Sequence, residues 1–539
     1  MEKNNPSQEK MMRASGFPLV SEDVMENILS RLPALSFASA ACVNKSWNEV
    51  CGRILSRPKL ASALSLNPSL HDAVKEVLDK VLSEPIAPHF AIACIGKKFS
   101  LEVTHRLITE KLGSSVPTIT NVANGIIGFD ALTNKLKEVK WESSDDEDDR
   151  DHGCGSNGPD STGDSLLDRG IVLVVGFVPG LKVDAIPLLR PNKVPGIPLV
   201  DKFVTDIRNF TASFSDSMSP AGIIVFGDEE TDMKPVLANM DFAMDEETVI
   251  VGNANGRFLC SSADNTRNNH SDTYYLDAVA LVFAKDKHKS ADIGETQFHV
   301  TLSTGVIPFG PQLQAVCVIA KDSERSWLTA RMEGQPEILY GEGLLVDIKD
   351  QLDDNETPDL YIGVVQHREF STGQSSSSGA SLAFYEVLGG DKEFFIINGV
   401  GVKPGDYFLF YHSDSDTASS SCGNAYRNLA ILKEESSNKN CLQSRNVAGN
   451  NEEKEVLGGL IFSGYPRGEA FYPCVDTFPF SDNFPGVPLA GVFCSGEIGR
   501  GSSSSISQED DEQNSARCSL HYHSTVYLVM SYVPAISKR

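Results

Sequence analysis

The stretch Val487–Gly499 reads VPLAGVFCSGEIG, and the chain contains two earlier stretches of the same form. These are VPTITNVANGIIG at Val116–Gly128 and, more distantly, TVIVGNANGRFL at Thr248–Leu259. Each begins with apolar residues and continues through small residues to a glycine, which permits a tight turn or a bulge where a strand ends. We interpret all three as the edge-turning strand of a repeated unit.

Each copy lies within a similar series of elements. A strand and a helix come before the glycine-containing stretch, and a polar loop and a long apolar strand follow it. Such an internal repeat predicts an α+β fold in which related, sandwich-like α/β units pack mixed sheets together. The expected strands are 89–96, 171–177, 221–227, 274–284, 457–464 and 521–533, with four more at 359–366, 381–389, 393–400 and 406–412; the expected helices are 100–113, 232–244 and part of 468–480.

The bulk composition narrows the class of protein. Asp plus Glu number 73 against 47 Lys plus Arg, which gives a formal net charge of −26. Such a surface repels phosphate backbones and anionic lipids, so we expect neither a nucleic-acid nor a membrane partner. The 11 cysteines include no Cys-x-x-Cys pair, and the N-terminus lacks the apolar core of a signal peptide. We expect a protein of the nucleus, the cytoplasm or both, without a cofactor.

Residues 17–60 are predicted to form short helices. Ser21 can cap the first helix, Pro33 ends it, and Ser36 can cap the next. Helices this short cannot make a stable core by themselves, so the module is expected to complete its core against a partner or a following domain. Its apolar residues recur every four positions at Val24, Ile28 and Leu32, and again at Val43 and Trp47.

This module resembles the F-box. The resemblance rests on a Phe-Pro pair, the apolar spacing, a Leu-Pro pair and a Val-x-x-x-Trp pattern over residues 17–47. In that family the motif docks on a Skp-type adaptor and, through it, on a cullin of a ubiquitin ligase. Val43 and Trp47 would contribute partly to this interface and partly to the core of the module. The resemblance implies an adaptor-binding surface made by Pro18, Val24, Ile28, Leu29, Leu32, Pro33, Val43 and Trp47.

The rest of the chain resembles the paired N-terminal and C-terminal FIST domains, which occur in bacterial sensory proteins and in some F-box proteins. The C-terminal match is carried by GQPEILYGE, GGLIFSGYPRG, FPGVPLAGVFCSGEIG and LHYHSTVYLVM, and the N-terminal match by TITNVANGIIG, GIIVFGD and VIVGNANG. Members commonly have Cys-x-Gly-Arg-Gly where this chain has Gly464-Tyr465-Pro466-Arg467-Gly468, so no role of that cysteine is transferred here.

Together the two resemblances imply four parts of the chain. The expected parts are a disordered N-terminus at 1–15, an F-box at 16–62, a FIST N-terminal domain at 88–285 with an acidic loop at 141–168, and a FIST C-terminal domain at 296–535 with polar loops at 412–422, 436–455 and 500–516.

The third glycine-containing stretch has an acidic residue at a position where the first two have none. Glu497 stands where they have Ile126 and Arg257. The predicted strand ends bring Glu497 close to Arg467, and such a pair can grip an amino-acid-like or peptide group. The other interpretation is a structural ion pair beside glycines that serve a turn. The candidate ligand- or substrate-binding residues are Arg467, Gly468, Gly496, Glu497 and Cys494.

Three further patterns have weaker implications. Cys494 lies in an apolar run and is expected to be a buried, unreactive thiol. His521 and His523 would share one face of a strand, but no further metal ligand is near them in the sequence, so no metal is expected. Ser143 and Ser144 precede an acidic run typical of an acidophilic kinase site, and an unmodified spacer explains that run equally well.

The motifs of common enzymes are missing from the sequence: there is no GxSxG, no HExxH and no phosphate-binding loop. The two resemblances imply a non-catalytic substrate receptor of a cullin-RING ligase, which brings an unknown protein to ubiquitination and proteasomal degradation, and the missing motifs agree with this expectation. The alternative is a small-ligand sensor or signal-transduction module that binds an amino-acid-like metabolite.

Overall fold

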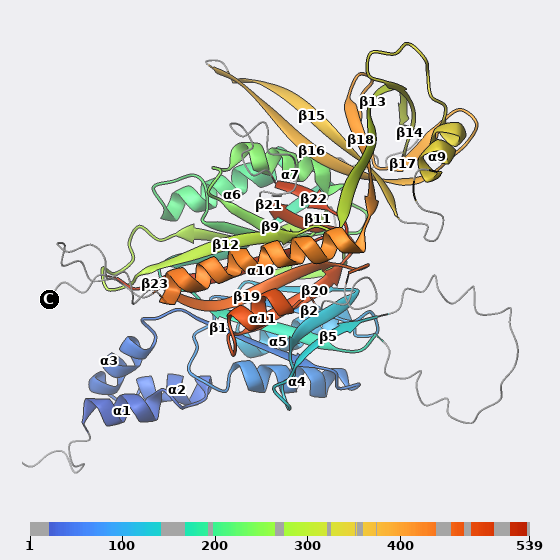
Figure 1. The fold of residues 1–539 in the computed structure, drawn as a ribbon. Coiled ribbons are helices and arrows are strands. Elements are labelled where there is room, and N and C mark those ends of the chain that lie inside the picture. Colours follow the sequence, from blue (N-terminus) through green and yellow to red (C-terminus); the bar gives the residue numbers. More distant parts are fainter. Residues whose placement is uncertain are drawn as a thin grey trace, which may run out of the picture.

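The computed structural model describes most of the chain from residue 21 to residue 535 (Figure 1). The described ranges are 21–141, 168–191, 198–264, 274–320, 325–350, 352, 359–372, 375–437, 454–467, 476–500 and 518–535, and within them the side chains of 365–382 are left aside. The expectations that fall outside these ranges concern residues 1–15, Pro18, Ser143, Ser144, Gly468 and most of the loops at 141–168, 436–455 and 500–516.

Three short helices begin the described chain: α1 (Glu22–Leu29), α2 (Ala34–Ala41) and α3 (Lys45–Ile54). The predicted cap is confirmed, since the Ser21 hydroxyl accepts a hydrogen bond from the Val24 amide. Ser36 does not cap α2, because Pro33 is itself the N-cap residue and the helix starts directly after it. The fixed φ of proline and its missing N–H suit the start of a helix. The core of this module consists of Leu29, Phe37, Ala40, Val50 and Cys51.

Three open mixed sheets of the described chain share one strand order. In each sheet the third and fourth strands are parallel and every other pair is antiparallel. Sheet 1 is β1 (Lys59–Ser65), β6 (Ile171–Phe177), β2 (Phe90–Ile95), β3 (Thr118–Val122) and β10 (Phe258–Ser261). Sheet 2 is β7 (Leu181–Pro191), β11 (Tyr274–Lys285), β8 (Gly222–Gly227), β9 (Val249–Asn253), β21 (Glu497–Arg500) and β22 (Cys518–His521). Sheet 3 is β12 (Glu295–Ser303), β23 (Thr525–Val533), β19 (Glu455–Gly464), β20 (Leu489–Cys494), β4 (Gly125–Phe129) and β5 (Leu136–Lys140).

The three glycine-containing stretches link these sheets in a cycle. The first runs from β3 in sheet 1 to β4 in sheet 3, the second from β9 in sheet 2 to β10 in sheet 1, and the third from β20 in sheet 3 to β21 in sheet 2. We call the short segments between these strand pairs the crossings. The internal repeat predicted from the sequence is thus seen as one strand order used three times. Each stretch is two strands in two different sheets, and not the single edge strand that we expected.

The inner faces of the three sheets pack on one shared core. Phe226 of sheet 2 and Phe462 of sheet 3 meet in it with ring centroids 6.3 Å apart, and Ile92 of sheet 1 joins them. Neighbouring residues of β2 point the other way, into a second cluster beneath the helices of sheet 1. Strands that are buried on both faces appear in the sequence as continuous apolar runs. The strand predictions over 89–96, 171–177, 221–227 and 457–464 follow from such runs, and the structure confirms them.

Helices cover the outer face of each sheet (Figure 1). The predicted helices at 100–113 and 232–244 are confirmed as α5 (Leu101–Leu112) and α7 (Met233–Ala243), and Gly113 ends α5 with φ of +96°. The expected polar loop at 412–422 is wrong, because most of it lies in the first turns of a helix that packs on sheet 3. The covering helices are α4 (Leu70–Val81) and α5 on sheet 1, α6 (Val200–Phe214) and α7 on sheet 2, and α10 (Ser415–Ser437) and α11 (Phe478–Asn483) on sheet 3.

A closed barrel stands between β12 and α10 in the chain and projects from the body (Figure 1). It contains the four further strands predicted in this region, which are confirmed as β15 to β18, but their closure into a barrel was not foreseen. Its strands, in barrel order, are β13 (Val306–Ala320), β14 (Arg325–Met332), β17 (Phe395–Asn398), β16 (Ser375–Gly390), β15 (Leu360–Thr372) and β18 (Tyr407–Ser413), and α9 (Gly341–Lys349) packs against it.

Two expected boundaries need correction. The strand predicted over 521–533 is two strands, because β22 ends at His521 in sheet 2 and β23 begins at Thr525 in sheet 3. The sheets also do not separate into halves at 88–285 and 296–535, since strands of both ranges pair in sheets 2 and 3. β1 and α4 both precede residue 88, yet β1 is a strand of sheet 1 and α4 packs on that sheet. The α+β class with mixed sheets is confirmed, with three sheets around one core in place of separate sandwiches.

Candidate functional site

Arg467 lies in the turn after β19 and is completely enclosed. Its side chain is 0% exposed, and its Nη2 atom lies 3.1 Å from Asp476 Oδ1, whose side chain is also 0% exposed. The same nitrogen donates to Ser303 Oγ at 2.9 Å. The Asp476 carboxylate accepts from the hydroxyls of Ser463 at 2.6 Å and Thr525 at 3.0 Å. A buried ion pair surrounded by such hydrogen bonds is a structural unit, because loss of either partner leaves a buried charge.

The predicted pairing of Arg467 with Glu497 is therefore wrong in its partner. Within the described residues, Glu497 accepts a hydrogen bond from the Ser524 amide at 3.3 Å, and the Cys494 thiol lies 4.0 Å from its Oε1 atom. Burial raises the pKa of the Glu497 carboxyl well above its usual value, although the Ser524 amide and the charge of Arg467 oppose that rise. Neither polar side chain of the predicted ligand site is open to solvent, so the structural interpretation is favoured here.

The other described members of the predicted site, Cys494 and Gly496, are also buried. Cys494 is buried in β20, and burial raises the pKa of its thiol well above the usual value, with the neighbouring Glu497 as a further cause. A thiol that stays protonated is a poor nucleophile, as expected from its apolar surroundings. Gly496 begins the turn into β21 with φ of +152°, and an added Cβ would lie 3.1 Å from Leu520.

His521 and His523 do not form a common face. His521 ends β22 and its Nε2 lies 3.2 Å from the Gly499 carbonyl, whereas His523 lies in the following turn with φ of +50°. The Nε2 atom of His523 is 2.8 Å from Asp359 Oδ2, and this contact fastens the barrel to the body. No cluster of three or more His, Cys, Asp or Glu side chains suited to a metal occurs in the part of the chain that the structure describes.

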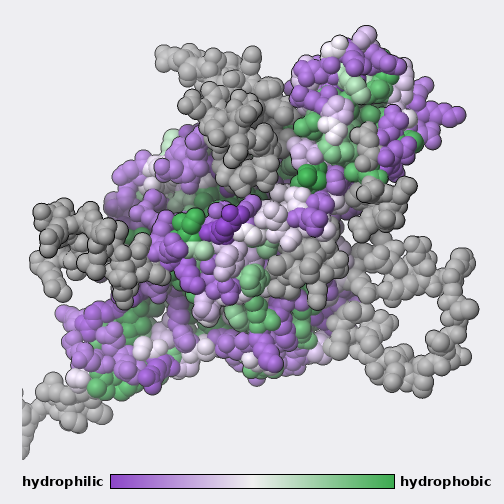
Figure 2. Space-filling view, in the orientation of Figure 1, coloured by the Kyte–Doolittle hydropathy of each residue, from purple (hydrophilic) through white to green (hydrophobic). Residues whose placement is uncertain are grey.

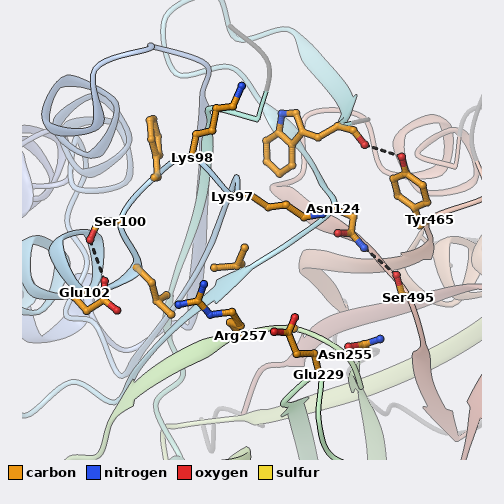
Figure 3. Close-up of a pocket in the computed structure, with 15 residues that line it drawn as sticks. Lys97, Lys98, Ser100, Glu102, Asn124, Glu229, Asn255, Arg257, Tyr465 and Ser495 are labelled. Atoms are coloured by element: carbon orange, nitrogen blue, oxygen red, sulfur yellow. Dashed lines mark hydrogen bonds between the residues drawn. The ribbon is translucent and has the colours of Figure 1, made fainter. Parts of the chain in front are cut away.

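A pocket of about 790 Å³ opens where the three crossings meet (Figure 3). All three crossings contribute to its wall: Asn124 from the first, Asn255, Gly256 and Arg257 from the second, and Ser495 from the third. The loops that follow β2, β8 and β19 complete it, so the pocket lies at the carboxyl ends of the parallel strands. In open α/β sheets that end is where ligands commonly bind. This pocket was not predicted from the sequence, although the residues after each of the three strands were available as a signal.

The polar groups of the pocket come from all sides. Asn124 Nδ2 donates to Ser495 Oγ at 2.9 Å, and the Tyr465 hydroxyl donates to the Trp141 carbonyl at 2.7 Å. At the start of α5, the Ser100 hydroxyl donates to Glu102 at 3.0 Å. The remaining charged side chains that line the pocket are Lys97, Lys98, Glu229 and Arg257.

Apolar side chains reach the surface on the N-terminal helices (Figure 2). Val24 and Ile28 of α1 are 50% and 54% exposed, Leu35 of α2 is 63% exposed, and Val43 is 60% exposed. Such a group on one small module marks a protein-binding surface. Leu29, in contrast, is 1% exposed and belongs to the core of the module, so it is not a surface residue as the resemblance implied. Leu32 and Trp47 are partly buried against that core, and Pro33 is exposed.

The comparisons with known proteins agree with this surface. A model of the F-box domain matches residues 17–59, which contain all three helices. An F-box/LRR-repeat protein of Arabidopsis thaliana is 38% identical over 528 residues, which cover 95% of this chain and 93% of that protein. The chain belongs to the F-box protein family. An F-box binds a Skp-type adaptor and, through it, a cullin, so this F-box protein has the general role of a substrate receptor.

The name of the relative includes leucine-rich repeats, in which successive repeats stack their strands along a horseshoe. The described strands of this F-box protein instead form mixed sheets and a barrel. One contributor to the F-box surface was missed from the sequence: Leu35, the most exposed apolar residue of these helices. No helix in the described part of the chain is both long enough and apolar enough to cross a membrane.

Proposed function

We propose that this F-box protein is the substrate-recognition subunit of an SCF-type cullin-RING ubiquitin ligase. The F-box helices dock the Skp-type adaptor, and the three-sheet body with its barrel recruits a target protein for ubiquitination and proteasomal degradation. The observation that carries this proposal is the group of exposed apolar residues on α1 and α2, beside a small core that is already filled by Leu29 and Phe37. None of these exposed residues belongs to an apolar cluster of the described chain, and such a group is typical of a protein-binding surface.

The receptor in this proposal is non-catalytic and resides in the nucleus, the cytoplasm or both. It raises the local concentration of target lysines near a ubiquitin-charged enzyme that another subunit supplies. We further propose that the body is a FIST domain pair, on the support of the motifs quoted above. The sensor alternative loses its first candidate site, because Arg467 and Glu497 are enclosed by the protein.

The adaptor proposal is tested by affinity purification of the full chain from cell extract. Val24→Asp and Ile28→Asp each place a charge on the exposed stripe of α1, and we expect both to lose the adaptor and the cullin. The matched control is Leu132→Asp, which changes a leucine of the body that is 77% exposed. Equal recovery of adaptor and cullin with wild type, both variants and the control would sink the proposal.

A further inference from the structure

The pocket is built from three equivalent positions that carry different chemistry. A glycine ends or directly follows β2, β8 and β19, and the next two residues are Lys97 and Lys98, Asp228 and Glu229, or Tyr465 and Pro466. The shared strand order explains why these positions meet, but it does not require two lysines in one unit. This departure from the repeat is the first indication that the pocket selects a ligand by charge.

Lys97 and Lys98 are two cations of the pocket that have no ion pair among the described residues, although the carboxylate of Glu229 also lines the pocket. Arg257 interacts electrostatically with the carboxylates of Glu102 and Asp228, and Figure 3 shows its guanidinium directed toward Glu102. Neither the Lys97 nor the Lys98 ammonium has a hydrogen bond within the part of the chain that the structure describes. Two adjacent lysines without an ion-pair partner among the described residues stand out in a chain with a net charge of −26. They are poised to attract carboxylates or phosphates.

The shape of the pocket favours a segment of a protein over a small metabolite. Sites for small molecules are mostly apolar and enclose most of their ligand. Here Lys97, Lys98, Glu229 and Arg257 are all exposed at the surface. In Figure 3 the Lys97 side chain extends toward Asn124, whereas that of Lys98 points in another direction, away from Lys97. Ammonium groups that diverge in this way suit several acidic side chains along an extended chain better than one compact anion.

We propose that this pocket is the contact site for an acidic or phosphorylated segment of the protein that the receptor recruits, held by Lys97 and Lys98. This inference rests on the proposed receptor function and names the chemistry of its target. Asn124, Asn255 and Ser495 provide hydrogen-bond groups for the backbone of the segment, one from each crossing.

The test measures peptide binding to the purified full chain by fluorescence anisotropy. The probes are a labelled octapeptide of Glu and Asp, the same peptide with two phosphoserines, and a neutral Gln and Asn counterpart. We expect at least one anionic peptide to bind, more weakly as salt is added, and the neutral peptide not to bind. The phosphorylated and carboxylate probes distinguish the two sources of charge, and either one satisfies the proposal. Lys97→Glu/Lys98→Glu should raise Kd by about tenfold or more.

The matched control is Lys75→Glu/Lys135→Glu, which reverses two exposed lysines outside the pocket and should leave Kd unchanged. The assay is repeated with the acidic run at 145–149 changed to the corresponding amides, because this run begins four residues after Trp141 and can compete with the probes. The proposal is overturned by equal binding of neutral and anionic peptides, by no effect of the pocket variant, or by no binding in either background. Ile28→Asp should not affect peptide binding and the pocket variant should keep the adaptor, so the two proposals fail separately.

Discussion

Asn124 and Ser495 occupy the same position in two different crossings, and they are joined by a hydrogen bond of 2.9 Å between Nδ2 and Oγ. The bond connects the segment that leaves sheet 1 for sheet 3 with the segment that leaves sheet 3 for sheet 2. A glycine follows each of these residues, at Gly125 and Gly496. The three crossings approach one another closely at this point, which leaves little room for side chains. A substitution at Gly125 can test this close packing.

Gly125→Ala should destabilise the protein. A Cβ at this position would lie 2.5 Å from the Val139 carbonyl oxygen and 2.7 Å from Phe493 Cδ2, so backbone or a buried ring has to move. Overpacking of this kind costs about 1–3 kcal/mol in the free energy of unfolding, measured by denaturant titration. The control is Gly343→Ala in α9, where nothing lies within 4 Å of the added Cβ and helix propensity favours alanine. Equal stability of the two variants would contradict the close packing of the crossing.

Arg467→Met should be among the most damaging single changes in the body. It leaves the Asp476 carboxylate buried without its cation, which costs about 3–5 kcal/mol of unfolding free energy. The double variant Arg467→Met/Asp476→Leu removes both charges and should recover a large part of this loss. Chemical denaturation of the single and double variants measures the difference. A double variant no more stable than the single one would mean that the hydrogen bonds, and not the charge balance, dominate this network.

Glu497→Gln should stabilise the protein at neutral pH, and the gain should depend on pH. Burial raises the pKa of Glu497 in the folded state above that in the unfolded state. Between the two pKa values the folded state therefore binds more protons, and wild-type stability falls by about 1.4 kcal/mol for each pH unit. The gain from glutamine should be smallest near pH 4.5 and grow as the pH rises toward neutrality. Unfolding midpoints of both proteins from pH 4.5 to 8 check this, and a gain independent of pH would show that the carboxyl is ionised when buried.

Substitutions at two neighbouring residues of α1 should have opposite effects: one should lower stability, and the other should abolish adaptor binding. Leu29→Ala removes a side chain that is 1% exposed in the F-box core and should cost about 2–5 kcal/mol of stability. Ile28→Asp changes a side chain that is 54% exposed and should alter stability by less than about 0.5 kcal/mol while it abolishes adaptor binding. Thermal unfolding together with adaptor pull-down separates the two effects. A strongly destabilised Ile28→Asp would place this residue in the fold and not in the interface.

Local signals in the sequence predicted local structure well. The Ser21 cap, the end of α5 at Gly113 and the double-sided apolar strands of the three sheets follow from short-range chemistry. α10 was missed because its Ser- and Asp-rich start resembles a loop. The spacing of its buried residues could have revealed it, since they recur every three or four positions at Ala418, Cys422, Ala425, Leu429 and Leu432.

The features that decide the candidate sites depend on partners far away in the chain. Arg467 donates a hydrogen bond to Ser303, which lies 164 residues earlier in the chain, and apolar periodicity does not indicate such a pairing. The local sequence does not predict the exchange of strands between sheets either, because a glycine permits both a turn within one sheet and a crossing to another sheet. The pocket depends on this exchange of strands, because its wall combines Asn124 of one crossing with Ser495 of another.

The exchange of strands has a consequence for how the protein is made. β4 and β5 leave the first unit early in translation, but β20, on which β4 pairs, is completed only when Cys494 has been synthesised. In the same way, β9 lacks its partner strand β21 until Arg500 has been synthesised. A nascent chain therefore leaves the ribosome with uncovered strand edges for most of its synthesis, and such edges are sites of aggregation. Cells that make this receptor have to protect those edges, and C-terminally truncated products should depend on chaperones or be degraded.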